Sequence, residues 1–274
     1  MSRNFIIPQR ALRVILIQNS AGADVEANLV RIEARMHKAP TCDLIALPEV
    51  FAIRGADADY RAVAERLPGQ ITKRLMALAA RARAWVLAGS VIEQGRGKIY
   101  NTSVLINRLG RIVAHYRKIH LFEANLDNGQ IVRESDIYAT GAKPVMAEVE
   151  GWSCGLAICY DLRFPELFRY YSKHGAALFF VPSNFTQKTG KDHWETLVRA
   201  RAIENQAFVV APNQCGVNPC TGIASHGHSL VVGPWGEVLA TAGDKETILA
   251  VTLQPEVLRR TRQRIPVLCH RRLG

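Results

Sequence analysis

The chain has 274 residues, with 35 lysines and arginines against 24 aspartates and glutamates, and 48% of its residues are hydrophobic. This composition is that of a globular protein and excludes disordered and fibrous classes. A chain of this length can bury about three quarters of its surface, so its core needs no disulfide or metal. No apolar run reaches the roughly 20 residues of a membrane-spanning helix, and the apolar stretch at 5–7 is too short for a signal peptide. We therefore expect a cytoplasmic protein that does not enter a membrane.

Short apolar strands alternate with amphipathic helices along the chain. The periodicity predicts a strand at 12–18, a helix over 27–39, a strand at 43–47, a helix over 69–82 and a strand at 85–90. In the first helix, Leu29, Ile32 and Met36 form one apolar stripe. The segments 99–107 and 111–118 then flank a turn and predict a hairpin. Further along, the pattern predicts strands at 153–160, 177–182 and 208–212, helices at 165–174, 192–206 and 255–264, and a second hairpin that turns at 233–236.

The mixture of strand–helix alternation with hairpins favours an α/β architecture in which two sheets pack together and helices cover the outside. No repeat or linker divides the chain, so we predict a single domain over 1–274, with a core at about 12–254 and an extended tail at the end of segment 255–274. Segment 120–143 is the one long stretch without clear periodicity, and loops of this length often line functional sites.

The basic charge and the cysteines do not by themselves define a function. Basic residues bind nucleic-acid phosphates by releasing counterions. Here they are interleaved with acidic and apolar residues, and no nucleic-acid-binding motif is present, so we expect no nucleic-acid partner. The six cysteines lack the spacing of a zinc site, and disulfides are unusual without a secretory signal. His226 and His228 would bind a metal only with a third ligand, which the neighbouring sequence does not offer, so we expect no metal or cofactor.

Three reactive side chains stand at the ends of predicted strands. Glu49 follows strand 43–47, Lys118 ends the first hairpin and Cys159 ends the most apolar strand. Ligands of α/β sheets gather beyond the carboxyl ends of strands, so an active site would use these positions. Taken alone, each residue has an ordinary explanation: a cysteine in an apolar strand is commonly a core residue, and a lysine at a strand end commonly guards an edge. We expect the three side chains to meet in a single crevice.

Three segments around these residues resemble the signature blocks of the nitrilase, or carbon–nitrogen hydrolase, superfamily. They are Leu47-Pro48-Glu49, the sequence YRKIHLF at 116–122 and the sequence CYDLRFPEL at 159–167. The resemblance runs from about residue 14 to residue 272. It implies a four-layer αββα sandwich that pairs with a second subunit. True nitrilases typically have Cys-Trp-Glu where this chain has Cys159-Tyr160-Asp161, which resembles the branch that holds omega-amidase and deaminated glutathione amidase.

The resemblance implies cysteine-dependent amide hydrolysis without a cofactor. Cys159 corresponds to the nucleophile, Glu49 to the proton carrier and Lys118 to the group that stabilises the negative oxygen. Glu134 lies where this branch carries a second glutamate, which would hold Lys118 charged; a purely structural ion pair is the alternative. The residues expected to bind the substrate are Tyr160, Arg163, Asn184 and Phe185.

Two departures from the family pattern leave the substrate open. Asn184 stands where relatives usually have alanine, and Lys191-Asp192 replaces a small or apolar pair. Asp161 and Arg163 either form a supporting ion pair or help to bind substrate.

Three functions remain in competition. The leading one is release of ammonia from a small carboxylate-bearing amide. The second is hydrolysis of an N-carbamoyl compound or a nitrile on the same residues, and the third is a non-catalytic basic binding protein. The expected partners are a small-molecule amide and a second copy of the chain in a homodimer, with the tail 255–274 at the subunit contact.

Overall fold

Two six-stranded sheets packed face to face form the centre of the molecule. The computed structural model describes residues 7–125, 129 and 131–272. In order across the first sheet, the strands are β14 (Thr247–Leu253), β1 (Leu12–Gln18), β2 (Leu44–Ala46), β3 (Trp85–Gln94), β4 (Ile99–Ile106) and β5 (Ile112–Arg117). Across the second, they are β13 (Val238–Thr241), β12 (Leu230–Val232), β11 (Phe208–Ala211), β10 (Leu178–Phe180), β9 (Trp152–Leu156) and β8 (Val145–Val149).

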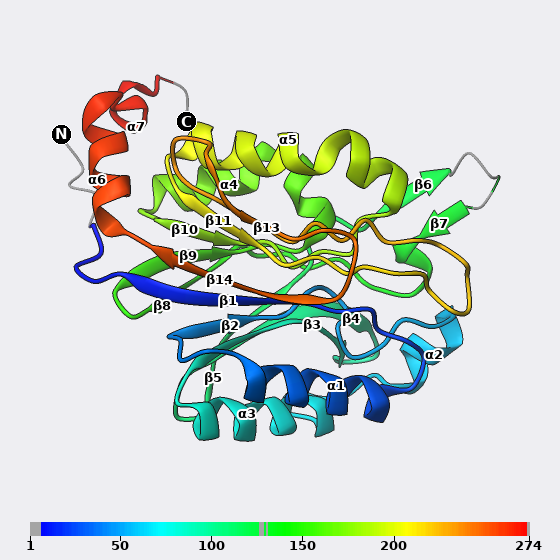
Figure 1. Cartoon of the computed structure of the whole chain (residues 1–274). Coiled ribbons are helices and arrows are strands. Elements are labelled where there is room, and N and C mark those ends of the chain that lie inside the picture. The colour runs from blue at the N-terminus through cyan, green and yellow to red at the C-terminus, as the bar shows by residue number, and fades with distance from the viewer. Residues whose placement is uncertain (1–6, 126–128, 130, 273–274) are drawn as a thin grey trace.

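Helices cover the outer face of each sheet. Helices α1 (Val25–Lys38) and α3 (Gln70–Ala82) lie on the first sheet, and α4 (Pro165–Lys173) and α5 (Gln187–Asn205) lie on the second (Figure 1). The arrangement is the predicted four-layer αββα sandwich. The shorter elements are the helices α2 (Asp57–Ala62), α6 (Pro255–Arg264) and α7 (Val267–His270), the 3-10 helices η1 (Glu134–Asp136) and η2 (Cys159–Arg163), and the paired strands β6 (Glu123–Asn125) and β7 (Ile131–Arg133).

The buried apolar faces explain this layering. In α1, the side chain of Asp24 accepts a hydrogen bond from the Ala27 N–H and caps the helix. The predicted stripe of Leu29, Ile32 and Met36 is confirmed, because all three side chains are buried against the first sheet. A larger apolar cluster fills the space between the two sheets and continues under α4 and α5; it includes Leu16, Leu156, Phe179, Val209 and Trp194.

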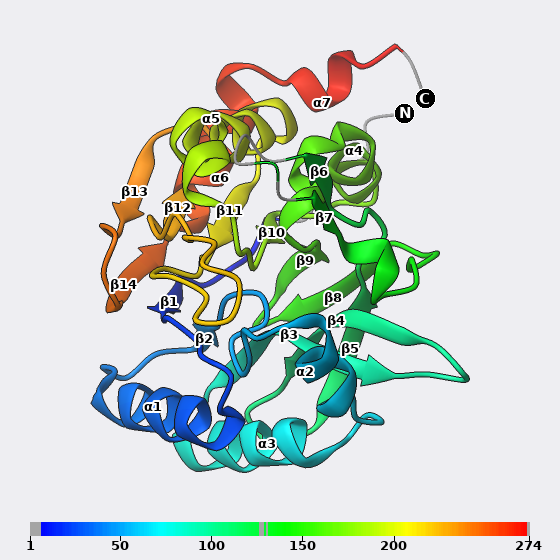
Figure 2. The same cartoon turned by 90° about the vertical axis from the view of Figure 1, so that its right-hand side faces the viewer.

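Each sheet has parallel strands at its centre, and their carboxyl ends carry the loops of interest. Strands β1, β2 and β3 run parallel in the first sheet, and β9, β10 and β11 run parallel in the second. The β6–β7 pair and α2 lie together at one end of the sandwich, whereas α6 and α7 lie at the other (Figures 1 and 2).

Several predicted boundaries are wrong, each for a local reason. The strand predicted at 85–90 continues to Gln94, because residues 91–94 pair with 99–102 after a bulge. The strand predicted at 153–160 ends at Leu156, because the chain turns sharply before η2. The helix predicted at 192–206 begins at Gln187. Segment 120–143 contains β6, β7 and η1, and the tail predicted as extended contains α7.

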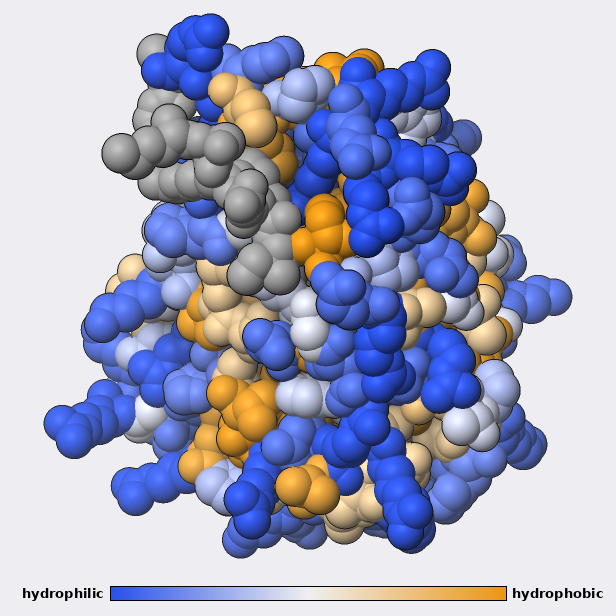
Figure 3. Space-filling model, turned by 90° about the vertical axis from the view of Figure 1, so that its left-hand side faces the viewer, coloured by the Kyte–Doolittle hydropathy of each residue, from blue (hydrophilic) through white to orange (hydrophobic). Residues whose placement is uncertain are grey.

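The side of the molecule that lies on the left in Figure 1 shows mainly hydrophilic side chains, with small separate hydrophobic areas (Figure 3). Within the described ranges, no helix has both the length and the apolar character needed to cross a bilayer.

Candidate active site

Glu49 lies directly beyond the carboxyl end of β2, and only 3% of its surface is exposed. The segment before Glu49 passes very close to Gly89 on β3. A Cβ on Gly89 would lie 1.8 Å from the carbonyl oxygen of Pro48, so only glycine fits there. The Ser90 Oγ accepts a hydrogen bond from the Val50 N–H at 2.9 Å. Gln214, beyond the end of β11 in the second sheet, donates to the carbonyl oxygens of Glu49 and Val50 at 3.0 and 3.1 Å. Groups from both sheets therefore hold Glu49.

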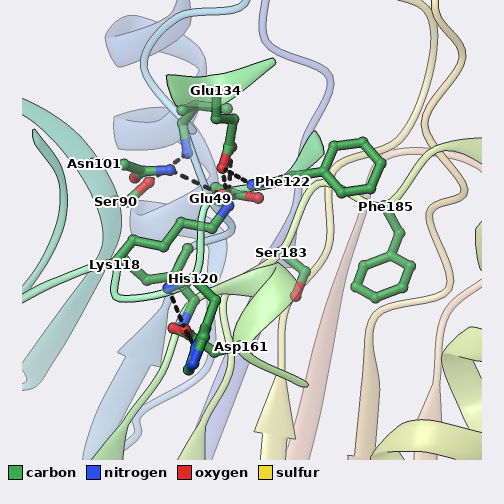
Figure 4. Close-up of polar contacts among 12 residues, drawn as sticks. Glu49, Ser90, Asn101, Lys118, His120, Phe122, Glu134, Asp161, Ser183 and Phe185 are labelled. Carbon is green, nitrogen blue, oxygen red and sulfur yellow. Dashed lines mark hydrogen bonds and ion pairs between the residues drawn. The ribbon is translucent and has the colours of Figure 1, made fainter. Parts of the chain in front are cut away.

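Lys118 follows β5, and its ammonium is buried between two carboxylates. Its Nζ lies 2.8 Å from Glu49 Oε1 and 2.8 Å from Glu134 Oε2. Asn101, on β4, donates from Nδ2 to the same Glu49 oxygen at 2.9 Å, and its carbonyl oxygen accepts the Lys118 N–H at 2.9 Å. Figure 4 shows the lysine side chain reaching between the two glutamates. Glu49 and Lys118, two of the three side chains expected to meet, are thus in direct contact, and Glu134 contacts Lys118 as expected.

Glu134 reaches Lys118 because the β6–β7 pair folds the chain back on itself. Its Oε2 accepts the Phe122 N–H at 2.7 Å, and its own N–H donates to the Phe122 carbonyl oxygen at 2.9 Å. Phe122 precedes β6 and Glu134 follows β7 directly. These two reciprocal hydrogen bonds close the hairpin at its base and fix the carboxylate over the ammonium.

Cys159 lies beyond the end of β9, at the start of η2, in a strained backbone conformation. Its φ of +47° is in the left-handed region, which costs a non-glycine residue about 1–3 kcal/mol. Its N–H donates to the Pro182 carbonyl oxygen at 3.0 Å, and the Asn184 backbone N–H hydrogen-bonds to its sulfur. Both partners belong to the chain that follows β10. The neighbouring strand therefore holds the turn that directs the thiol away from the sheet.

Asp161 connects the turn of Cys159 to the segment of Lys118. Its side chain is fully buried. One oxygen accepts the Tyr116 hydroxyl and the Ile158 N–H, each at 2.8 Å. The other accepts the His120 N–H at 3.1 Å and contacts the His120 Nδ1 at 2.7 Å (Figure 4). The His120 ring stacks on Phe164 with ring centroids 3.7 Å apart. Asp161 is thus a positioning residue between the two sheets.

Replacement of Asp161 by asparagine is expected to lower the free energy of unfolding by about 2–3 kcal/mol. Either orientation of the amide would turn its NH2 group toward a buried N–H or O–H donor, so at least one hydrogen bond is lost. Urea denaturation followed by circular dichroism measures the change. The exposed Asp192→Asn serves as the control and should leave the midpoint in place; equal midpoints for the two variants would contradict the role given to Asp161.

The pKa values of the clustered groups follow from burial and mutual charge. Burial raises the pKa of the Cys159 thiol well above its ordinary value of 9.0, the Glu49 carboxylate raises it further, and the Lys118 ammonium lowers it. Burial lowers the pKa of Lys118, but Glu134 and Glu49 outweigh this and raise it well above 10.5. Burial also raises the pKa of Glu134 above 4.5, against the opposing effect of Lys118. At neutral pH a protonated thiol therefore faces a charged ammonium.

The charge of Glu49 gives a pH-dependent prediction. Since this carboxylate raises the pKa of Cys159, Glu49→Gln should shift the pH profile of Cys159 alkylation by iodoacetamide to lower pH. Mass spectrometry of the peptides after timed alkylation measures the profile. The exposed Cys269 in the same sample is the internal reference and should show the same profile in both proteins. A Cys159 profile that stays in place or moves to higher pH would show that Glu49 does not act on the thiol.

A cavity of about 340 Å³ opens directly over these groups. Glu49, Glu134 and Cys159 form part of its wall, so the thiol and the carboxylates face one space. The remaining wall comes mainly from the loop after β2, from α2, from the β7–η1 segment and from the stretch 218–225. A small molecule entering this cavity reaches the sulfur of Cys159.

The four residues predicted to bind substrate divide into two groups. Asn184 lines the main cavity, together with Cys159. Tyr160, Arg163 and Phe185 line a much smaller pocket of about 20 Å³, which Cys159 and Asn184 also border.

The ion pair considered between Asp161 and Arg163 is not formed. Asp161 is bound to Tyr116 and His120, as described above. Arg163 turns outward instead, where its Nη2 lies 3.2 Å from His193 Nδ1 and its guanidinium lies 5.8 Å from the centroid of the Phe185 ring.

Three residues that hold or line the site were missed at the level of sequence: Asn101, Gln214 and Arg54. Asn101 lies in a predicted strand and Gln214 follows another, and a polar residue there signals only that one face is not apolar. Arg54 ends the apolar run 50–53 and is almost fully buried, which a sequence pattern does not reveal.

The histidine pair considered for a metal is a stacked pair of rings with centroids 4.2 Å apart. Burial, together with a smaller effect of His228, lowers the pKa of His226 to about 4. Across the described parts of the chain, no three side chains of histidine, cysteine, aspartate or glutamate are grouped as metal ligands.

An αββα sandwich in which a cysteine and two glutamates line one cavity, with a lysine buried between the glutamates, is the arrangement of a class of enzymes that hydrolyse carbon–nitrogen bonds. Comparison with known proteins agrees. The carbon-nitrogen hydrolase family profile matches residues 13–263. The chain therefore belongs to the carbon–nitrogen hydrolase family.

Individual relatives cover nearly the whole chain. The chain is 41% identical over 234 residues to a deaminated glutathione amidase of Synechocystis sp., covering 84% of this chain and 86% of that protein. It is 34% identical over 264 residues to the human omega-amidase NIT2, covering 96% and 95%. The crystal structure of Saccharomyces cerevisiae Nit3, a member of branch 10 of the nitrilase superfamily, superposes with a TM-score of 0.85 at 32% identity over 96% of this chain and 97% of that chain.

Proposed function

We propose that the protein is an amidase that cleaves the terminal amide of a small carboxylate-bearing molecule to an acid and ammonia through a thioester on Cys159. The observation that carries this proposal is the buried ammonium of Lys118 between Glu49 and Glu134, beside a cysteine that faces the same cavity. The names of the Synechocystis and human relatives support the amidase reaction and the substrate class.

In the first half of the reaction, Glu49 accepts the thiol proton as the sulfur attacks the amide carbon. A general base is needed because burial keeps Cys159 protonated at neutral pH. The carbon–sulfur bond forms and the amide oxygen becomes negative. Collapse of this intermediate breaks the carbon–nitrogen bond, and Glu49 returns the proton to the nitrogen, which leaves as ammonia.

In the second half, Glu49 removes a proton from a water molecule that attacks the thioester carbon. The carbon–sulfur bond breaks, the acid product leaves and the sulfur regains its proton from Glu49. One carboxylate thus serves as base and acid in both halves, which requires it to stay close to the thiol throughout. The hydrogen bonds that hold the Glu49 backbone from both sheets support this role.

Lys118 and the backbone N–H of Tyr160 stabilise the negative oxygen. Tyr160 directly follows the nucleophile in the first turn of η2, where N–H groups lack partners within the helix. Each such donor is typically worth about 3–4 kcal/mol in the transition state. Glu134 keeps Lys118 charged and fixed in place. Tyr160, Arg163, Asn184 and Phe185 complete the proposed substrate contacts around Cys159.

Ammonia release from a substrate panel tests the proposal. The panel contains 2-oxoglutaramate, deaminated glutathione, a neutral aliphatic amide, an N-carbamoyl amino acid and a nitrile. Turnover confined to the carboxylate-bearing amides, with an acyl adduct on Cys159 in intact-protein mass spectra, supports it. Turnover of only the carbamoyl compound or the nitrile assigns the same residues to that chemistry instead. If no compound is turned over and no adduct forms, the result favours the third alternative, a non-catalytic binding protein.

The proposal includes a homodimer formed by a single domain over 1–274, with the tail 255–274 at the subunit contact. Large hydrophobic side chains are exposed on α4, α5, the β12–β13 turn and the chain after α6: Tyr170, Ile203, Trp235 and Ile265. We expect light scattering to give about twice the mass of one chain, and Ile203→Asp to halve it. A wild-type protein with the mass of one chain would contradict the dimer.

A cytoplasmic location without nucleic-acid or membrane partners also belongs to the proposal. All six cysteines are free, as is usual in a reducing compartment.

A further inference from the structure

A buried arginine lines the proposed substrate cavity without an acidic partner. Arg54 lies on the loop after β2, five residues beyond Glu49, and only 1% of its surface is exposed. Its guanidinium donates to three uncharged oxygens: the Ala21 carbonyl at 3.1 Å, the Ser20 hydroxyl at 3.1 Å and the Ser225 hydroxyl at 2.5 Å. No carboxylate among the described residues forms an ion pair with it. The positive charge of Arg54 is therefore not neutralised by the protein.

Such a charge is costly to bury without a partner of opposite charge, and the chain provides one comparison. Arg201, which is also almost fully buried, pairs with Glu204. Burial lowers the pKa of Arg54, but a guanidinium remains protonated in a protein. Since a buried cation is normally paired or coordinated, an anion is the partner that this site lacks.

Arg54 is connected to the nucleophile through two side chains. The Ser225 hydroxyl accepts from Arg54 and donates to the Asn184 Oδ1 at 2.6 Å. The backbone N–H of Asn184 in turn binds the sulfur of Cys159. An alanine at position 184 could not orient Ser225 in this way. Asn184 thus belongs to the same arrangement as the unpaired arginine.

The charges at the other end of the cavity make a separate anion site necessary. Lys118 is already paired with both Glu49 and Glu134, so its positive charge is balanced there and is not left over for the carboxylate of a substrate. Arg163 is the cation that the sequence indicated, but it lies at the small pocket and contacts His193. Arg54 faces the larger cavity that also contains the thiol.

We propose that Arg54 is the specificity-determining residue that binds the free carboxylate of the substrate while the amide lies at Cys159. A guanidinium has five N–H groups, of which three are used, so one remains on each terminal nitrogen. Two such groups match the two oxygens of a carboxylate. This inference rests on the proposed amidase function for its reaction, but carboxylate binding by Arg54 is measurable without turnover.

Kinetics with two substrates of similar shape provide the first test. Succinamate carries a carboxylate and an amide, and its methyl ester is neutral. We expect the wild type to prefer succinamate in kcat/KM by about 30- to 100-fold, as for a hydrogen-bonded charged pair. Arg54→Gln should remove this preference by raising KM for succinamate, with little change for the ester, and Arg54→Lys should restore part of it. A purely structural role would instead lower kcat for both substrates equally.

Arg111→Gln is the matched control, because it removes one positive charge at an exposed position outside the cavity. The preference should be unchanged in this variant. Equal kcat/KM for succinamate and its ester in the wild type would overturn the proposal, and so would a preference that persists in Arg54→Gln. If Arg54→Gln does not fold, the proposal is tested by the preference of the wild type for succinamate over its ester and by the change of this preference in Arg54→Lys.

Calorimetric binding of succinate, a product-like dicarboxylate, separates this inference from the proposed reaction. Even if no amide is hydrolysed, succinate should bind the wild type and Arg111→Gln equally, and Arg54→Gln about 30- to 100-fold more weakly. Binding that is equal in the wild type and Arg54→Gln, or absent from the wild type, would overturn the role of Arg54.

Discussion

Replacement of Cys159 by alanine is expected to reduce ammonia release by about 10⁴-fold or more, because no thioester can form without the sulfur. The backbone N–H of residue 159 should keep its hydrogen bond to the Pro182 carbonyl oxygen, so the turn before η2 is retained. Steady-state kinetics and thermal unfolding of the same sample give both quantities. The variant should unfold within a few degrees of the wild type.

A second cysteine variant separates loss of the nucleophile from loss of a thiol in general. Cys269 is exposed on α7, at the end of the sandwich away from the β6–β7 pair (Figure 1). Cys269→Ala should therefore retain full turnover. Wild-type activity in Cys159→Ala would disprove the thioester mechanism, because the remaining buried groups provide no other nucleophile in the proposed reaction.

Replacement of Lys118 by methionine is expected to abolish turnover and also to lower the free energy of unfolding by about 3–5 kcal/mol, since it leaves two buried carboxylates without their cation. The pKa of Lys118 is raised above 10.5 in the folded protein. Its stabilising contribution is therefore fully present below pH 10.5 and is lost as the pH rises through the folded-state pKa. Urea denaturation at several pH values measures the free energy of unfolding and its pH dependence, and an ammonia-release assay measures turnover.

A double variant distinguishes the structural role of Lys118 from its chemical role. Glu134→Gln removes one of the two facing charges, so its combination with Lys118→Met should recover part of the stability and none of the activity. The exposed Lys98→Met controls for the loss of a lysine and should behave as the wild type. A Lys118→Met variant as stable as the wild type would contradict the stabilisation of the two carboxylates by the ammonium.

The layer architecture was predictable because each sheet buries one continuous apolar face. The stripe of Leu29, Ile32 and Met36 and the apolar strands follow directly from side-chain periodicity. Edge strands such as β8 and β14 were missed, because exposed and half-buried residues dilute the apolar pattern there. Segment 120–143 gave no prediction of β6, β7 or η1, since these short elements depend on contacts with Phe122 and Lys118 rather than on local pattern.

The candidate site was predictable in part, because strand ends and family motifs mark Glu49, Lys118 and Cys159. The supporting residues were not, because their roles depend on distant partners. Gln214 lies 165 residues from Glu49 along the chain, and Arg54 lies 171 residues from Ser225. Asp161 was correctly placed near the site, but its partners are Tyr116 and His120 rather than Arg163. Only the packing of the two sheets brings such residues into contact.

The two kinds of wall around the cavity have a practical consequence. The groups proposed to break the bond lie beyond strand ends and are held by buried hydrogen bonds, whereas much of the remaining lining comes from α2 and from the connection at 218–225. Connections of this kind tolerate sequence change far better than strand ends do. Grafting new segments there while keeping Ser225 is thus a route to altered selectivity that leaves the strand ends untouched, and the same modularity would let gene duplicates acquire new substrates by loop divergence alone.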